Sequence, residues 1–375
     1  MSIRRWRNEL VKSYINFRGW HTDRKLVVIE SDDWGTIRMP SRAVYESLAA
    51  NNPAVANDPF SRYDTLADAA DLAALFEVLS RHKDKNGNHP VITANTIMAN
   101  PDFPAIQAAA FEIYSYERFD QTVLRTQANG KETLALWQEG IASKLFYPQL
   151  HGREHVHALA WLRELKQGNT ELLQAFEQAC FGVPYRSKMG NKRKNLLAAF
   201  DQWGMAGEAS FQARALEEAA QMFQSYFGYK AISFIAPAYV WHPSLEAELQ
   251  VNGIRSLQGL AVQQVPRKKQ YRRRLHFTGQ KNRLGQYYSV RNVFFEPTPK
   301  PNQDWVDSAL TKTQAAFAAK KPAILSSHRI NFIGELAEKN RTGNLKRFDQ
   351  LLGRMLQKWP QIEFLTSAEL VKAIT

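Results

Sequence analysis

The sequence predicts an α/β fold, a distorted (β/α) barrel of seven or eight mainly parallel strands. Three observations support this fold class. Apolar runs rich in Val, Ile and Phe alternate with helical patterns along the whole chain. About eight of these runs have the length of strands, and polar residues stand at the ends of several of them. Such alternation is typical of a parallel sheet whose strands are joined by helices.

The elements follow in a regular order. The expected strands cover residues 25–31, 90–97, 144–150, 231–237, 253–258, 291–295, 322–327 and 361–366. Apolar residues recur at helical spacing over 65–83, 157–165, 214–228 and 344–360, and Gly228 is placed to end the third of these helices. The segment 167–213 is longer than a crossover needs, and we expect a helical insertion there. No internal repeat or low-complexity linker divides the chain, so we expect one domain over residues 1–375.

Positive charge is concentrated in two parts of the chain. There are 49 Lys and Arg against 36 Asp and Glu, and much of the excess lies in residues 1–20 and 267–283. Basic clusters attract polyanions, although a solvated basic loop explains them equally well. Residues 4–17 have the spacing of a basic amphipathic helix, which suits a membrane surface or packing on the domain. We expect no specific nucleic-acid partner, because no recognisable binding module accompanies the charge.

The sequence contains no apolar run of membrane-spanning length and no secretory signal at its N-terminus. Its single cysteine, Cys180, excludes an internal disulfide. We therefore expect a cytoplasmic protein, with the basic segments as candidates for peripheral contact with the inner face of a membrane.

Two carboxylates and two histidines stand at the ends of expected strands. Asp32 and Asp33 end the first strand, and His151 and His155 follow the third, which runs into HGREHVH. A spacing of four brings both imidazoles to one side of a helical turn, where they can share a metal ion. One aspartate completes a three-residue metal site, and the other is then free to act as a base on water. Taken singly, H-x3-H also arises by chance, and Asp-Asp before Trp-Gly is also ordinary turn chemistry.

Other side chains are expected at the same edge of the sheet, because parallel barrels place their sites at the carboxyl ends of strands. His328 stands at the end of the strand 322–327 and is expected to reach the two aspartates. Core packing is the alternative for any aromatic among the candidate substrate contacts. These candidates are Trp34, Asn95, Tyr239, Trp241 and Arg291.

The ordered set ESDDWG, HGREH and ILSSHR resembles the polysaccharide deacetylase family, which is carbohydrate esterase family four with the chitooligosaccharide deacetylase homology domain, within the glycoside hydrolase/deacetylase superfamily. The family's Thr-Phe-Asp-Asp motif implies that Asp32 is the catalytic base and Asp33 a metal ligand. Its His-[Ser/Thr]-x-x-His motif implies that His151 and His155 are metal ligands, with a glycine replacing the small hydroxyl residue. Its Leu-x-His motif resembles LSSH, with one extra residue, and implies that His328 is the general acid.

Two further motifs of the family are altered in this sequence. The Arg-x-Pro motif, whose arginine orients the base, corresponds best to FIAPAY, where Pro237 remains but Ile235 stands at the arginine position. Arg153, Arg291 and Arg329 are candidates to replace the missing cation, and the sequence selects none of them. The Asp-x-x-x-Trp motif has no clear counterpart, and RSLQGL occupies its region.

The resemblance implies a metal-dependent hydrolase that removes an acetyl group from an N-acetylated or O-acetylated sugar, acting on carbon–nitrogen bonds in the first case. The saccharide would be a polysaccharide, a lipid-linked saccharide or a precursor. One divalent ion is implied, and zinc is the expected metal. Two other interpretations stay open: a glycoside hydrolase of the same superfamily, and a catalytically degenerate protein that binds glycans.

Overall fold

A nine-stranded parallel sheet forms the centre of the computed structural model, which describes residues 18–187, 193–268 and 270–375. The strand order is β12-β9-β8-β5-β2-β1-β14-β13, and β15 pairs with β1 beside β2. All nine strands of this sheet run parallel to their neighbours, whether or not the sequence predicted them. They are β1 (Lys25–Trp34), β2 (Ile92–Ile97), β5 (Phe146–Gly152), β8 (Ser233–Ile235), β9 (Ser256–Gly259), β12 (Tyr287–Val290), β13 (Val293–Phe294), β14 (Ala323–His328) and β15 (Ile362–Leu365).

Eight of the parallel strands curl through 259° into a half-barrel, and one stretch of chain joins the two edges of the sheet. Strand β12 pairs with β9, and β13, which follows after two residues, pairs with β14. The backbone N–H of Arg291 donates to Gly259 at the end of β9, and that of Asn292 donates to Ile324 in β14. The expected distorted (β/α) barrel is confirmed, and Arg291 lies where the chain crosses from one edge to the other.

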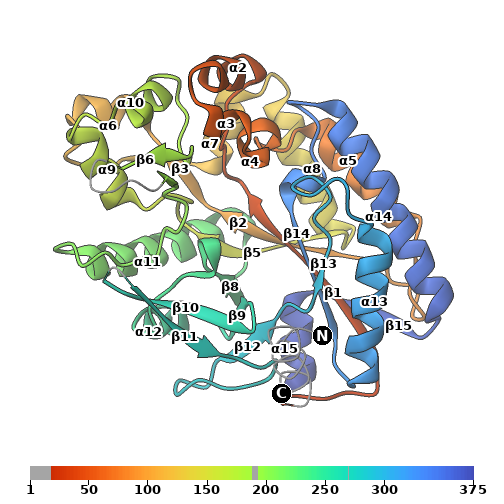
Figure 1. Ribbon diagram of the computed structural model, residues 1–375. Coiled ribbons are helices and arrows are strands. Elements are labelled where there is room, and N and C mark those ends of the chain that lie inside the picture. The colour runs from red at the N-terminus through yellow and green to blue at the C-terminus, as the bar shows by residue number, and fades with distance from the viewer. Residues whose placement is uncertain (1–17, 188–192, 269) are drawn as a thin grey trace, which may run out of the picture.

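Helices cover the outer face of the curled sheet (Figure 1). The expected helices at 65–83, 157–165, 214–228 and 344–360 are confirmed as α5, α9, α11 and α14. The covering helices are α5 (Ala69–Ser80), α8 (Gly130–Ala142), α11 (Glu208–Phe227), α12 (Leu245–Val251), α13 (Trp305–Ala318) and α14 (Glu338–Lys358). Helix α15 (Ser367–Ile374) lies on the inner side instead, where Leu370 packs with Leu26 and Val28 and Ser367 donates to Glu30.

Strand β1 is central and buried on both faces. Val27 and Ile29 belong to the main hydrophobic core, whereas Leu26 and Val28 pack with Ile324 in a smaller cluster. A strand covered on both faces needs apolar residues at every position, which explains its unbroken apolar run.

A second hydrophobic core lies beside the carboxyl ends of the strands and joins short elements from distant parts of the chain. The short elements around the barrel are α2 (Arg42–Asn51), α3 (Pro53–Ala56), α4 (Pro59–Tyr63), β3 (Ala99–Pro101), α6 (Phe103–Ala108), β4 (Tyr116–Arg118), α7 (Phe119–Thr126), α9 (Ala158–Lys166), α10 (Thr170–Glu177), β6 (Tyr185–Arg186), β7 (Arg193–Lys194), η1 (Pro237–Tyr239), β10 (Val262–Arg267), β11 (Gln270–Leu275) and η2 (Arg329–Asn331).

The insertion at 167–213 is less helical than expected. It contains α10, the β6–β7 pair and the first turn of α11, because the chain between the two helices lacks apolar residues at helical spacing.

Part of the basic segment 267–283 lies in the antiparallel β10–β11 hairpin, which the sequence did not predict. The basic helix expected at 4–17 lies outside the described residues. Within the described parts of the chain, no helix is long and apolar enough to cross a membrane.

Candidate active site

The end of β1 departs from regular strand geometry at the two aspartates. The pairing of β1 with β2 shifts register between Ser31 and Trp34, and Asp33 has a φ of 72°. This left-handed conformation is more accessible to Asp than to most other residues. Successive side chains of a regular strand point to opposite faces, so Asp32 and Asp33 would then diverge. The irregularity instead directs both carboxylates into one cavity.

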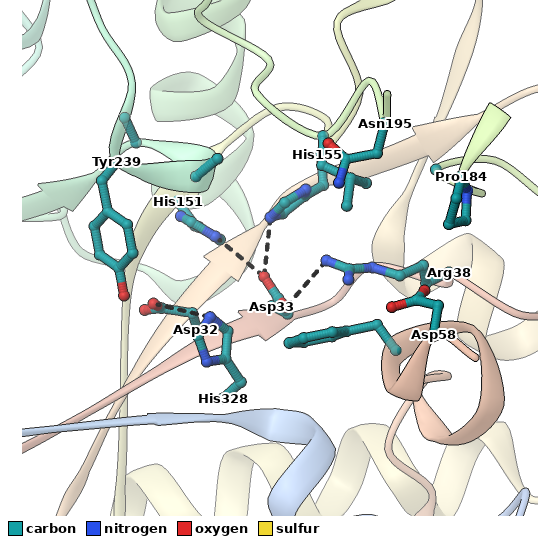
Figure 2. A pocket seen from close by; sticks show the side chains of 15 residues that line it. Asp32, Asp33, Arg38, Asp58, His151, His155, Pro184, Asn195, Tyr239 and His328 are labelled. Carbon is teal, nitrogen blue, oxygen red and sulfur yellow. Dashed lines mark hydrogen bonds and ion pairs between the residues drawn. The ribbon is translucent and has the colours of Figure 1, made fainter. Parts of the chain in front are cut away.

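Asp33 faces two histidines (Figure 2). Its Oδ1 lies 3.4 Å from Nε2 of His151 and 3.0 Å from Nε2 of His155. The Nδ1 of His151 lies 2.8 Å from the carbonyl oxygen of Ile235 and must carry the proton of that hydrogen bond, which leaves the lone pair on Nε2. One ligand atom from each of the three side chains lies within 4.8 Å of the others. One carboxylate and two imidazoles therefore fit the expected divalent ion, with coordination positions left for water and substrate.

The two histidines come from a strand end and the loop after it, so the expectation of a helical turn is wrong. His151 belongs to β5, and Gly152 then adopts a φ of 124°, which favours glycine. The turn brings the ring of His155 to 5.2 Å from that of His151, centroid to centroid. A glycine turn thus achieves the proximity that a helix was expected to give.

Arg38, which the sequence did not single out, binds the other oxygen of Asp33. Its Nη2 lies 3.2 Å from Asp33 Oδ2, and its Nε lies 3.4 Å from the buried carboxylate of Asp64. Burial alone would raise the pKa of Asp33, but His155 and Arg38 hold it well below its usual range. Asp33 is therefore ionised, and Arg38 fixes the orientation of its carboxylate.

Asp32 is bound at both oxygens by Arg291. The two Asp32 oxygens accept hydrogen bonds from Nη1 at 2.5 Å and Nη2 at 2.7 Å, and Asn95 donates a third at 2.8 Å. The Nε of Arg291 donates to Glu30 at 2.7 Å, and these side chains are all buried. Burial alone would raise the pKa of Asp32, but Arg291 lowers it to about 2. Asp32 is therefore a carboxylate throughout the neutral range.

Of the three arginines that could replace the missing family cation, Arg291 occupies the position beside the proposed base. Arg329 is bound to the buried Asp64, and Arg153 is bound to Glu154. Arg291 could not be selected from sequence, because it lies in the segment that joins the two edges of the sheet and is separated from Asp32 by 259 residues.

His328 lies across the cavity from Asp32, with its Nε2 4.0 Å from Asp32 Oδ2. Its Nδ1 lies 2.7 Å from Oε1 of Glu296, whose other oxygen accepts a hydrogen bond from Asn331 at 2.8 Å. Burial alone would lower the pKa of His328, but the carboxylate of Glu296 raises it well above its usual value. His328 is therefore an imidazolium at neutral pH, with a proton on Nε2 to donate. The sequence analysis missed Glu296, although it stands two residues after the end of a strand.

The expected substrate contacts are not all at the cavity. Tyr239 lines it, and its hydroxyl accepts a hydrogen bond from Arg291 at 3.2 Å. The expectation is wrong for Trp34 and Trp241, which are 1% and 3% exposed and pack against core aromatic rings. Asn95 and Arg291 lie buried beneath the cavity, where they bind Asp32 in place of a substrate.

No protein-family model matches the sequence, and no curated protein matches it. Solved structures with a similar course of the chain include a family 4 acetyl xylan esterase from Clostridium thermocellum, with 11% identity over 93% of this chain and 91% of that chain and a TM-score of 0.37. An allantoinase shows 11% identity over 94% and 91% of the two chains, with a TM-score of 0.45. A 4-α-glucanotransferase from Thermococcus litoralis shows 10% identity and a TM-score of 0.44, over 93% of this chain but 40% of the glucanotransferase.

Proposed function

We propose that this protein is a metal-dependent hydrolase that removes an acetyl group from an N-acetylated or O-acetylated sugar. The observation that carries the proposal is that two adjacent carboxylates have different partners. Asp33 faces two imidazoles, whereas Asp32 is bound by Arg291 and faces the imidazolium of His328 across the cavity. The candidate metal ligands, a base and an acid therefore surround the same cavity.

Each group has a role in acyl transfer to water. A divalent ion held by Asp33, His151 and His155, with zinc the preferred candidate, would supply Lewis acidity to the acyl carbonyl and to water. Asp32 accepts the proton of the attacking water. His328 donates its Nε2 proton to the leaving nitrogen or oxygen as the bond to the acyl carbon breaks. The products are acetate and the free amine or alcohol of the sugar.

Two competing interpretations fit the site less well. A retaining or inverting glycoside hydrolase pairs a carboxylate with a carboxylic acid, whereas the acid that faces Asp32 is an imidazolium. The degenerate-site interpretation depended on the missing family arginine, and Arg291 now provides a cation at the base.

Acetate release from N-acetylglucosamine oligosaccharides and from O-acetylated xylan, measured with zinc-loaded protein, tests the proposal. Asp32→Asn keeps the shape of the side chain but cannot accept the proton, so we expect turnover to fall by about 10²-fold or more. Its metal content should equal that of the wild type, because Asp32 is not a ligand. Asp349→Asn, on a helix that does not line the cavity, is the control. The proposal fails if zinc-loaded wild type releases no acetate from either class of saccharide, or if Asp32→Asn turns over at the wild-type rate.

A further inference from the structure

The cavity above the two aspartates is small and has walls on several sides. Its volume is about 210 Å³, below the roughly 300 Å³ at which small-molecule pockets usually begin. The carboxyl ends of the strands and η1 form the floor and one side. Two further walls come from segments outside the barrel, namely α4 and the insertion.

The wall from α4 carries an aromatic ring and a carboxylate. The ring of Phe60 lies between two cationic groups, 4.8 Å from the guanidinium of Arg38 and 5.6 Å from the ring of His328. Asp58 caps α4 by accepting hydrogen bonds at Oδ2 from the backbone N–H and the hydroxyl of Ser61, at 2.9 Å and 2.6 Å. The Asp58 side chain also faces the cavity (Figure 2). A flat apolar ring beside a hydrogen-bond acceptor suits a sugar, which has an apolar face and donor hydroxyls.

The wall from the insertion consists of Gly182, Pro184, Asn195 and Leu197. It is fixed to the rest of the protein, because the carbonyl oxygen of Pro184 accepts a hydrogen bond from Asn52 at 3.2 Å. Buried neighbours hold it from behind in the second hydrophobic core; these are Phe181, Val183, Tyr185 and Leu196. A wall held by core packing does not move aside without a large loss of buried apolar contact.

Resting on the proposed function, we propose that the site acts on the end of a saccharide and not on units inside a long chain. A polysaccharide bound through an interior unit must leave a site in two directions. The cavity of about 210 Å³ between these walls matches one acylated sugar, and we infer that the walls exclude neighbouring units on both sides. The substrate class is therefore an acetylated monosaccharide or the terminal unit of a short oligosaccharide, with Phe60 and Asp58 contacting its ring.

Saturation-transfer NMR with zinc-loaded protein tests this inference by a readout of binding that does not depend on turnover. The probes are N-acetylglucosamine and its di- and hexasaccharide. We expect saturation of one terminal unit of each probe, and during turnover the loss of a single terminal acetyl group, located by fragmentation mass spectrometry. Saturation or deacetylation of interior units would overturn the inference, as would the absence of binding by all three probes. Terminal binding without acetate release would refute the proposed function and leave this inference standing.

A matched pair of variants tests the wall itself. Phe60→Ala removes the ring from the cavity, and we expect interior units of the hexasaccharide to gain saturation. Tyr63→Ala removes an aromatic side chain from the same helix outside the cavity lining, and we expect the terminal pattern to persist. An unchanged terminal pattern in a folded Phe60→Ala protein would show that this wall does not restrict the substrate.

Discussion

Replacement of Glu296 by Gln tests whether a carboxylate keeps His328 protonated. The two Glu296 oxygens accept from His328 Nδ1 at 2.7 Å and from Asn331 Nδ2 at 2.8 Å. A Gln side chain has one acceptor oxygen, so one of these donors would face an NH₂ group. Hydrogen bonds to charged groups contribute about 1.5–3 kcal/mol and neutral ones about 0.5–1.5 kcal/mol. The difference, about 1–1.5 kcal/mol, corresponds to a proton affinity of His328 that is about five- to thirteenfold lower.

The groups that face His328 set the sign of the effect. Besides Glu296, the negative charges of Asp32 and Asp33 and the phenol of Tyr239 lie close to it, and they remain in the variant. The pKa of His328 should therefore fall but stay raised by these neighbours. An acid that loses its proton at lower pH moves the alkaline limb of the kcat/KM profile to lower pH.

Two measurements check this prediction. The pH titration of the His328 imidazole, followed by NMR, should move to lower pH in Glu296→Gln, and the alkaline limb of acetate release should move with it. Asp349→Asn removes a carboxylate that lies 2.7 Å from the imidazole of His82, away from the cavity, and should leave the alkaline limb unchanged. An unchanged His328 titration in a folded Glu296→Gln protein would refute the role assigned to Glu296.

The other predictions concern metal, stability and pH. His151→Ala and His155→Ala should each lose bound zinc after dialysis, as measured by elemental analysis, and wild-type metal content would contradict the ligand assignment. Arg291→Met should lower the free energy of unfolding by about 3–5 kcal/mol in urea, because it leaves two buried carboxylates without a cation; a change near zero would be inconsistent with this ion pair. Burial and the nearby Arg274 lower the pKa of His276 to about 4. The unfolded state, with a histidine pKa near 6.5, binds more protons between about pH 6.5 and 4, so stability should fall by up to about 3 kcal/mol as the pH drops through that range. His276→Gln should remove most of this dependence, and an unaltered pH profile of thermal unfolding would count against it.

Sequence patterns located the strands that carry the site. Every expected strand of the main sheet overlaps an observed one, because a strand buried on both faces requires a continuous apolar run, as residues 26–29 show. The polar residues after those runs led directly to Asp33, His151, His155 and His328. The placement of these four side chains around one cavity was predictable from the parallel direction of the strands.

The groups that tune the site were not predictable in the same way. Arg38 and Glu296 act through side-chain hydrogen bonds across the cavity, and no periodicity marks such a partner. The prediction of two tryptophans as substrate contacts was wrong, because an aromatic residue near a strand end fits the core equally well. Trp34 packs against core rings and not against the cavity. The irregularity at Asp33 also leaves no local signal except Gly35, two residues later.

The place of β1 in the sheet has a consequence for the protein during translation. Strand β1 pairs along one side with β14 and, on the other, with β2 and β15, whose last paired residue is Leu365. A ribosome must therefore extend the chain as far as Leu365 before β1 can complete its ladder. Until then the apolar residues 26–29 have an open edge, which other nascent chains could pair with. Chaperone contact with this segment would protect the protein most in the interval before β14 emerges.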